Sequence, residues 1–234
     1  MYARNAIRLK KINLYAMISE VKNMDCMDYM RQFPDKFFDL AVVDPPYGID
    51  KAFSATSRVA KYGQTQSVND LKPNSDYFKE LFRVSKNQII WGYNHLSDML
   101  PSCKEFIFWY KHQPVVSYAD GELAWTSFQK TAKCFDFPYF GNVNTDKIRI
   151  HPTQKPVALY AWIFKNFAGG GQKILDTHLG SGSSRIAAWK IGLDFYGCEL
   201  DQEYFDKMEA RFQQECNGIE VVNNVVIQQT SLFG

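Results

Sequence analysis

Residues 173–200 read KILDTHLGSGSSRIAAWKIGLDFYGCEL, and this stretch decides the fold. An apolar run that ends in an acid, Lys173–Asp176, predicts a strand, and the glycine turn after it leads into a helix from about Ser183 to Ile191. A second strand, Asp194–Cys198, and a helix from about Gln202 to Cys216 follow. A strand–turn–helix–strand–helix unit is the core of a doubly wound sheet.

The same alternation extends toward the N-terminus. Short apolar runs predict strands at Phe38–Val43, Ile89–Trp91 and Phe106–Trp109, and helical spacing predicts a helix over Asp76–Val84. A longer helix is predicted from Gln154 to Ala168, with a proline in its first turn. Strands that alternate with helices predict an α/β protein with a doubly wound, mostly parallel sheet of the Rossmann-like kind.

One domain over residues 1–218 accounts for these elements. It divides into a catalytic half at about 20–110, an irregular insert at about 111–150 and a cofactor half at about 151–216. Gly, Pro and Asn residues interrupt the insert, and we expect it to form a small target-recognition region. Residues 219–234 form a separate C-terminal segment.

Composition excludes several classes of protein. The 234 residues are 46% hydrophobic and 22% charged, as in ordinary globular domains. Five cysteines without a CxxC pair, and four scattered histidines, argue against a disulfide framework and a zinc site. No signal peptide and no run of about 18 apolar residues is present, so we expect a cytoplasmic protein without a metal. The net charge of +2 is too small to identify a nucleic-acid partner.

The glycine turn of the cofactor half predicts a ligand site. Gly180 and Gly182 allow a ligand to approach the backbone, and the helix N-terminus behind them offers amide donors. Glu199 lies 19 positions after Gly180 (199 − 180), the spacing of an acid that binds a ribose diol. An adenosine-containing ligand is therefore predicted; a tight turn with a helix-capping acid is the alternative.

NAD is the first rival ligand for this turn. Its fingerprint requires a third Gly or Ala, where this chain has Arg185. Asp176, directly before the turn, suits a cationic ligand, and the ammonium and sulfonium groups of S-adenosylmethionine fit it better than a pyrophosphate does.

The segment Asp44-Pro45-Pro46-Tyr47 follows the predicted strand Phe38–Val43. Because its prolines lack amide donors, the loop would present carbonyls and the Asp44 carboxylate without a nearby donor. An exocyclic base amine is a double donor that such acceptors would orient for attack on a sulfonium methyl group. Tyr47 would stack on the base, which must leave the DNA stack to enter. A rigid proline turn is the alternative.

With the DPPY segment first and the glycine turn second, the chain resembles the β-class amino-methyltransferases of DNA. More narrowly, it resembles the compact adenine-type methylases of phages and prophages. The resemblance runs from about Asn23 to Phe212, and the DPPY segment before the glycine turn marks the class. It implies adenine N6 as the target, since Asp rather than Ser precedes the prolines; cytosine N4 is the alternative. A role in restriction-modification is a further implication.

The resemblance also assigns roles to single residues. Asp25, with Cys26 beside it, would meet the adenine amino group of the cofactor, and the HPTQKP segment at 151–156 would close over its methionine moiety. Where many relatives have Pro-Phe, this chain has Thr177-His178, and His178 is better read as an aromatic wall than as a general base. The implied catalytic residues are Asp44, Pro45, Pro46 and Tyr47. The implied cofactor-binding residues are Asp25, Cys26, His151, Thr153, Gln154, Lys155, Asp176, His178, Gly180, Ser181, Gly182, Glu199 and Leu200.

Two further segments predict partners. The stretch from Lys51 to Asn69 has no acid and contains Lys51, Arg58 and Lys61, so we expect it to contact the phosphates of double-stranded DNA. A solvated loop is the alternative. The C-terminus resembles the peptide by which bacterial replication proteins bind the sliding clamp, through Gln229, Leu232 and Phe233. The alternative is a tail packed on its own domain. Relatives are often dimers, so a homodimer is also expected.

Three functions fit the sequence. The first is the DNA amino-methyltransferase. The second is an RNA or protein-amide methyltransferase, although those relatives usually carry Asn before Pro-Pro-Tyr and have the cofactor half first. The third is a non-catalytic DNA-binding subunit of the same fold, which the intact Asp44, Tyr47, Asp176 and Glu199 argue against.

Overall fold

The computed structural model describes residues 17–48, 71–114, 119–140, 142–151, 153–216, 219–222 and 225–228. Within these ranges, no helix is both long and apolar enough to cross a membrane. Several predicted partner residues lie outside them, and their roles stay predictions: Lys51, Arg58, Lys61, Gln229, Leu232 and Phe233.

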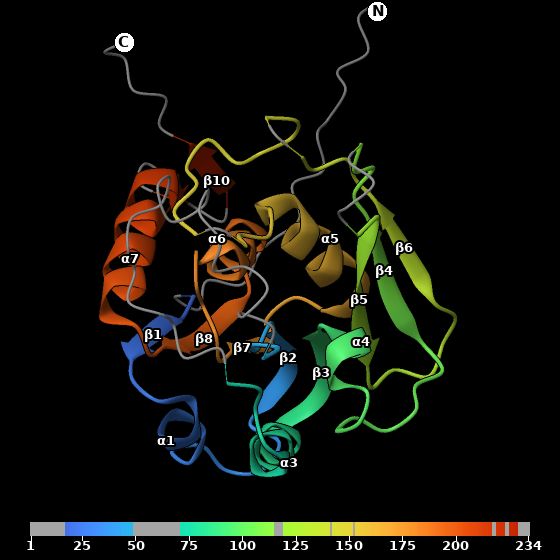
Figure 1. Ribbon diagram of the computed structural model, residues 1–234. Coiled ribbons are helices and arrows are strands. Elements are labelled where there is room, and N and C mark those ends of the chain that lie inside the picture. Colours follow the sequence, from blue (N-terminus) through green and yellow to red (C-terminus); the bar gives the residue numbers. More distant parts are fainter. Residues whose placement is uncertain are drawn as a thin grey trace, which may run out of the picture.

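An eight-stranded sheet runs through the centre of the molecule in the order β1–β8–β7–β2–β3–β5–β4–β6 (Figure 1). All neighbouring strands are parallel except at β5, which is antiparallel to both β3 and β4. The predicted doubly wound, mostly parallel sheet is therefore confirmed. The strands are β1 Ser19–Asn23, β2 Phe38–Val43, β3 Ser85–Trp91, β4 Phe106–Tyr110, β5 Gly121–Thr126, β6 Lys133–Asp136, β7 Lys173–Asp176 and β8 Asp194–Glu199.

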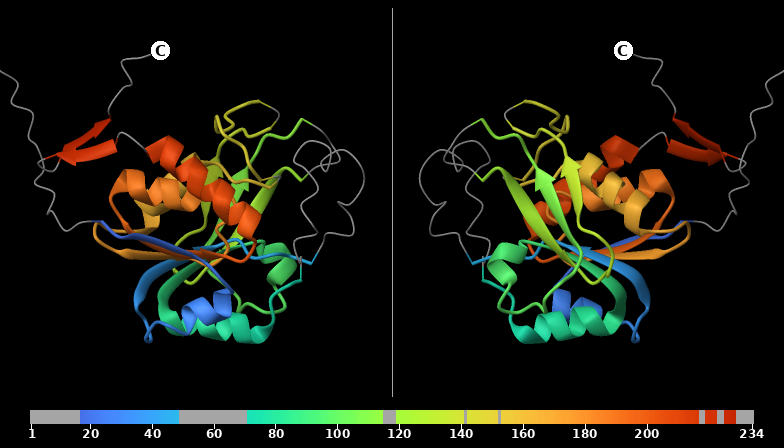
Figure 2. Two further views of the ribbon diagram at one scale, coloured as in Figure 1. Left: turned by 90° about the vertical axis from the view of Figure 1, so that its left-hand side faces the viewer. Right: turned by 90° about the vertical axis from the view of Figure 1, so that its right-hand side faces the viewer.

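Helices cover both faces of the sheet, which gives three layers (Figure 2). One face carries α1 Cys26–Met30, α3 Ser75–Val84 and α4 Tyr93–Leu96. The other face carries α5 Val157–Phe167, α6 Ser183–Ile191 and α7 Gln202–Cys216. The helices expected from apolar spacing are thus present, and their apolar sides pack on the sheet.

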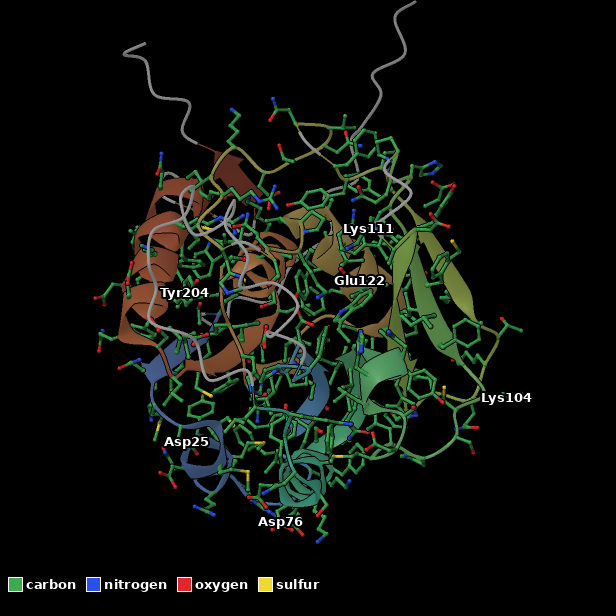
Figure 3. All side chains as sticks on the ribbon, viewed as in Figure 1. Asp25, Asp76, Lys104, Lys111, Glu122 and Tyr204 are labelled. Atoms are coloured by element: carbon green, nitrogen blue, oxygen red, sulfur yellow. The ribbon has the colours of Figure 1, made fainter. Side chains whose placement is uncertain are left out.

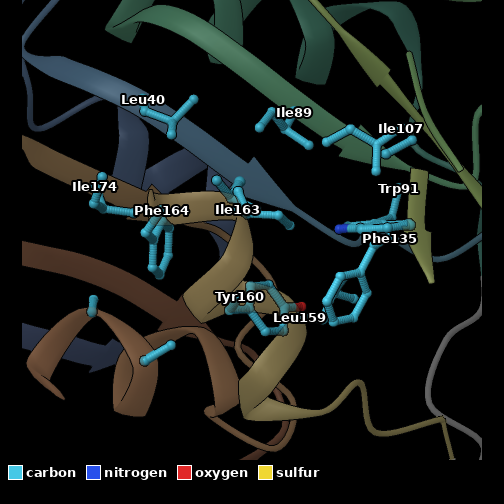
Figure 4. Close-up of a cluster of buried hydrophobic side chains, with 14 of the residues drawn as sticks. Leu40, Ile89, Trp91, Ile107, Phe135, Leu159, Tyr160, Ile163, Phe164 and Ile174 are labelled. Atoms are coloured by element: carbon cyan, nitrogen blue, oxygen red, sulfur yellow. The ribbon is translucent and has the colours of Figure 1, made fainter. Parts of the chain in front are cut away.

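Strand β2 is covered on both faces over Leu40–Val43. Leu40 and Val42 belong to the cluster beneath α5, whereas Ala41 and Val43 belong to the cluster beneath α3. A parallel strand covered on both faces needs apolar residues at every position, rather than at alternate ones. Figure 4 shows Leu40 among the side chains of the α5 cluster.

Two details differ from the sequence prediction. Helix α5 begins at Val157 rather than Gln154, because Pro156 has an extended backbone and stands at the N-cap. Residues 111–150 are also more regular than expected: β5 and β6 lie there, and β5 pairs directly with β3. The prediction of irregular structure is wrong for these strands, because charged and glycine residues interrupt the strand pattern of β5. The rest of the segment stays a candidate target-recognition region.

The described part of the C-terminal segment forms a separate two-stranded antiparallel sheet of β9 Ile219–Val222 and β10 Val225–Gln228.

The connections place a topological switch point between β2 and β7. From β2 the chain passes to β3 on one side, and from β7 it passes to β8 on the other side. In open α/β sheets, ligands bind outside the carboxyl ends of the strands at such a point.

Candidate active site

Two acids meet at the switch point. Asp176 is the last residue of β7, and Asp44 follows β2 directly. The two strands are in parallel register, with Leu40 opposite Ile174 and Ala41 opposite Leu175, so both acids lie at the same edge. The predicted acceptor loop and the predicted cofactor turn are therefore neighbours.

Asp176 is buried and has local donors. The Ser184 hydroxyl donates to one oxygen at 2.6 Å, and the His178 backbone amide donates to the other at 3.0 Å. Burial nevertheless raises the pKa of Asp176 to about 7, and the negative charges of Asp44 and Glu199 add to this rise. A cation bound next to such an acid would stabilise its ionised form.

The glycine turn has the backbone that its sequence predicted. Gly180 and Gly182 have φ values of 48° and 71°, in the left-handed region, and Gly182 is the N-cap of α6. A Cβ on Gly182 would lie 2.4 Å from Met208 Cγ, so this position has no room for a side chain. The Ser181 hydroxyl lies 3.1 Å from the Ser183 hydroxyl, within the turn.

Glu199 closes this turn from the end of β8. One carboxylate oxygen accepts from the Gly180 amide at 2.8 Å, and the other accepts from the Asp201 amide at 3.0 Å. Burial raises the pKa of Glu199, although both amides oppose this. The acid therefore fixes the turn, and ribose binding by its remaining lone pairs stays a prediction.

His151 lies over the glycine turn. A Cβ on Gly180 would be 4.0 Å from its Cδ2 atom, and its ring packs on Tyr204 with 4.5 Å between centroids (Tyr204 is labelled in Figure 3). The Thr153 hydroxyl lies 3.0 Å from His151 Nδ1. Burial lowers the pKa of His151 to about 4, so the ring is neutral at pH 7.

The Asp44 carboxylate does not stand in a donor-free pocket, so that prediction is wrong. The Tyr47 hydroxyl donates to Oδ1 and the Lys155 ammonium donates to Oδ2. The prolines do remove local amide donors, but the tertiary fold brings in a lysine from 111 positions along the chain.

The ring of Tyr47 is held by the start of α4. It stacks on His95, with 5.2 Å between centroids and 16° between planes. Gly92 has a φ of 79°, and a Cβ there would lie 2.1 Å from the Tyr47 ring. The Tyr47 ring therefore fits only because residue 92 is glycine, and its contact with a base stays a prediction.

Gln154 was predicted to bind the cofactor, but its side chain is buried and used inside the protein. Its amide nitrogen donates to Asp146 at 3.0 Å and to the Ile148 carbonyl at 2.9 Å, and its oxygen accepts from the Ile150 amide at 3.1 Å. Arg211 binds the same Asp146 oxygen at 3.0 Å. Gln154 therefore shapes the chain before α5, and its contact with the cofactor stays a prediction.

Three of the predicted residues follow β1 and β8. Asp25 caps α1 by accepting from the Met27 and Asp28 amides. Burial, and next the charge of Asp25, raises the pKa of the Cys26 thiol to about 11, so it stays protonated. Leu200 is 66% exposed just after β8. Cofactor contacts of these residues stay predictions.

His178 packs against Tyr77, and its role as an aromatic wall over the cofactor stays a prediction. Its ring meets Tyr77 edge-on, with 5.4 Å between centroids, and its Nδ1 atom lies 2.9 Å from the Thr177 hydroxyl. Burial lowers its pKa to about 4, so the ring is uncharged at pH 7.

Sequence reasoning missed Lys111, Glu122 and Tyr160, which all lie near Asp44. Glu122 forms ion pairs with Lys111 and Lys155, and the pKa of Tyr160 is raised by burial and by the charges of Asp176, Asp44 and Glu122. An acid in a strand that is otherwise apolar, within GELAWT, was the available signal.

Fold and site together define a doubly wound α/β protein whose switch point brings a glycine turn and a buried acid next to a proline-flanked acceptor loop. A family model described as DNA methylase, for the N6/N4 enzymes, matches residues 82–210, which is more than half of the chain. The chain belongs to this DNA methylase family.

Individual relatives agree with this assignment. The type II methyltransferase M.HpaI of Haemophilus parainfluenzae is 22% identical over 83% of this chain and 74% of its own length. M.BglII of Bacillus subtilis, also a type II methyltransferase, is 24% identical over 81% of this chain and 67% of its own. The crystal structure of M1.HpyAVI with S-adenosylmethionine has the same fold, with a TM-score of 0.55 and 20% identity over 82% of this chain and 98% of that one.

Proposed function

We propose that this enzyme transfers a methyl group from S-adenosylmethionine to the exocyclic amine of a flipped base in double-stranded DNA, and that the base is adenine, methylated at N6. One observation carries the proposal: Asp44 and Asp176 meet at the carboxyl ends of two neighbouring parallel strands. The acceptor loop for an amine and the turn for a cofactor therefore open into the same crevice.

The residues of the turn fit the proposed cofactor. S-adenosylmethionine supplies an electrophilic methyl group on a sulfonium. Asp176 is a buried acid that a cation would stabilise in its ionised form, and Glu199 stands at the end of the next strand, where a ribose diol would bind. His151 lies over the same turn and would cover the ligand.

The loop after β2 supplies the amine acceptors. A base amine would donate one proton to the Asp44 carboxylate and the other to the carbonyl of Pro45 or Pro46. These bonds localise the nitrogen lone pair and orient it for attack, and the carboxylate stabilises the positive charge that develops on nitrogen. The Tyr47 hydroxyl, which donates to the other Asp44 oxygen, would hold the carboxylate in that orientation.

A methyl-transfer assay tests the proposal. Tritiated S-adenosylmethionine is supplied with DNA, RNA or a protein mixture, and the labelled DNA is hydrolysed to nucleosides. Label in N6-methyladenine is the expected result. Label in N4-methylcytosine would show that the target base is cytosine. Label in RNA or protein alone would show that the substrate is not DNA. No label with DNA of mixed sequence would indicate a non-catalytic binding subunit.

The partners need separate tests, because their residues lie outside the described ranges. Neutralising Lys51, Arg58 and Lys61 together should weaken DNA binding and flatten its salt dependence, since each phosphate contact releases counterions. Purified bacterial sliding clamp should capture the wild type but not a Leu232→Ala/Phe233→Ala variant. Sedimentation of the free protein would decide whether it is a homodimer.

A further inference from the structure

Four side chains of alternating charge form a chain of contacts from the acceptor loop to the end of β4. They are Asp44 after β2, Lys155 before α5, Glu122 on β5 and Lys111 just after β4. Figure 3 shows Lys111 and Glu122 together beside α5. The proposed chemistry uses only the first of these groups, so the other three need a reason to be there.

Lys155 is the centre of this charge chain. Its side chain is 5% exposed, and its ammonium contacts acids on two sides. The contact with Asp44 is an aligned hydrogen bond, whereas the contact with Glu122 Oε2 is a 3.1 Å ion pair without that alignment. Lys111 donates a hydrogen bond to Glu122 Oε1. Among the described residues, Glu122 Oε2 has no hydrogen-bond partner. Glu122 therefore offers Lys155 a second, incompletely used acceptor.

The two central groups of the charge chain are charged at neutral pH. Burial alone would raise the pKa of Glu122, but the ammonium groups of Lys155 and Lys111 outweigh it and lower that pKa to about 2. Burial alone would lower the pKa of Lys155, and here Asp44 and Glu122 raise it instead. Glu122 and Lys155 therefore face each other as an ion pair.

Asp44 already has a donor on each oxygen, Tyr47 on one and Lys155 on the other, and each oxygen keeps a second lone pair. Because an ammonium binds a carboxylate more strongly than a neutral amine does, Lys155 competes with the proposed substrate donor. Simply expelling a buried ammonium would leave it unpaired, which costs several kcal/mol. Glu122 removes this cost, because Lys155 already touches it and only has to shift.

We infer that Lys155 takes the place of the target amine on Asp44 in the substrate-free enzyme and shifts onto Glu122 when the base enters. This inference rests on the proposed function. Lys155 and Glu122 are then positioning residues: they act through Asp44, and Glu122 determines how easily Asp44 is released. Lys111 holds Glu122 in place through its other oxygen.

A set of three variants tests the shift. Glu122→Gln removes the charge that attracts Lys155, so Lys155 should stay on Asp44, and kcat/KM for DNA should fall about tenfold while the Kd of S-adenosylmethionine is unchanged. Adding Lys155→Met to Glu122→Gln removes the competing ammonium, and we expect the double variant to be at least fivefold more active than Glu122→Gln alone. Glu122→Asp keeps the charge and should retain more activity than Glu122→Gln.

The controls separate this result from a loss of folding. Glu105→Gln neutralises a fully buried acid that bonds the Lys130 amide away from the charge chain, and it should leave kcat/KM unchanged. Urea midpoints identify any variant that is unfolded. If the double variant is no more active than Glu122→Gln, Lys155 is merely structural and the inference is wrong, while the proposed function stands. If the wild type transfers no methyl group to DNA, the proposed function and this inference both fall.

Discussion

The glycine turn and the acceptor loop lie side by side at the switch point, but they are held in different ways. In the turn, the bonds of the two acids are local: Ser184 binds Asp176 across 8 positions and Gly180 binds Glu199 across 19. In the loop, the Asp44 carboxylate is bound by Lys155 from 111 positions away. The first region is assembled by one stretch of chain, and the second needs the whole sheet.

This difference explains which expectations held. A turn whose partners lie within one strand–helix–strand unit is specified by spacing alone, and Lys173–Glu199 folded as its sequence predicted. The chemistry of the acceptor loop depends on Glu122 from β5 and on Lys155 from the segment before α5. A donor-free pocket was therefore a sound prediction from local sequence and a wrong one for the folded chain.

The largest effect should come from Asp44→Ala. Removing a preorganised electrostatic group typically costs 10²–10³-fold in rate, and we expect a loss of about a thousandfold in methyl transfer. Calorimetry should show unchanged binding of S-adenosylmethionine, because the turn has its own local bonds. Asp39→Asn, on the same strand but bonded to Lys86 and the Lys173 amide, is the matched control. If Asp44→Ala keeps an activity within tenfold of wild type, Asp44 is not a catalytic residue.

Next in size is Gly92→Ala, which tests how the acceptor loop is supported. The new Cβ would meet the Tyr47 ring at 2.1 Å on a backbone with positive φ, so about 3 kcal/mol of stability should be lost. Methyl transfer should also fall, because the displaced tyrosine no longer holds Asp44. Gly170→Ala has no atom within 4 Å of its Cβ and should change the urea midpoint little. If Gly92→Ala and Gly170→Ala lower the urea midpoint equally, Gly92 does not support the Tyr47 ring.

The pH dependence of cofactor binding tests the turn. The pKa of Asp176 is about 7 in the free protein, and a bound cation favours the ionised form, so binding releases a proton. Affinity for S-adenosylmethionine should therefore fall below pH 7, by up to about tenfold per pH unit, and level off above it. Calorimetry from pH 5.5 to 7.5 measures this; His151 and His178, with pKa values of about 4, stay neutral throughout. Asp176→Asn should bind weakly but without this slope, and a flat wild-type curve would refute the role.

The smallest effect is expected for His178→Phe. The ring is neutral and packs edge-on against Tyr77, so phenylalanine should serve as the same wall and activity should stay within about threefold, far from the 10²–10⁴ of a general base. The lost contact with Thr177 should cost about 1 kcal/mol of stability. A hundredfold loss of kcat in a folded variant would instead make His178 a proton acceptor.

Local sequence by itself determined the alternation of strands and helices in a doubly wound sheet, the turn at Gly180 and the acids that end β7 and β8. It could do so because apolar period, glycine position and short spacing act over one or two neighbouring elements. The tertiary structure alone decided that Lys155 binds Asp44, that Glu122 stands behind it and that Gln154 turns inward. Buried charges require partners wherever the fold can supply them, and those partners came from strands and loops far apart in the chain.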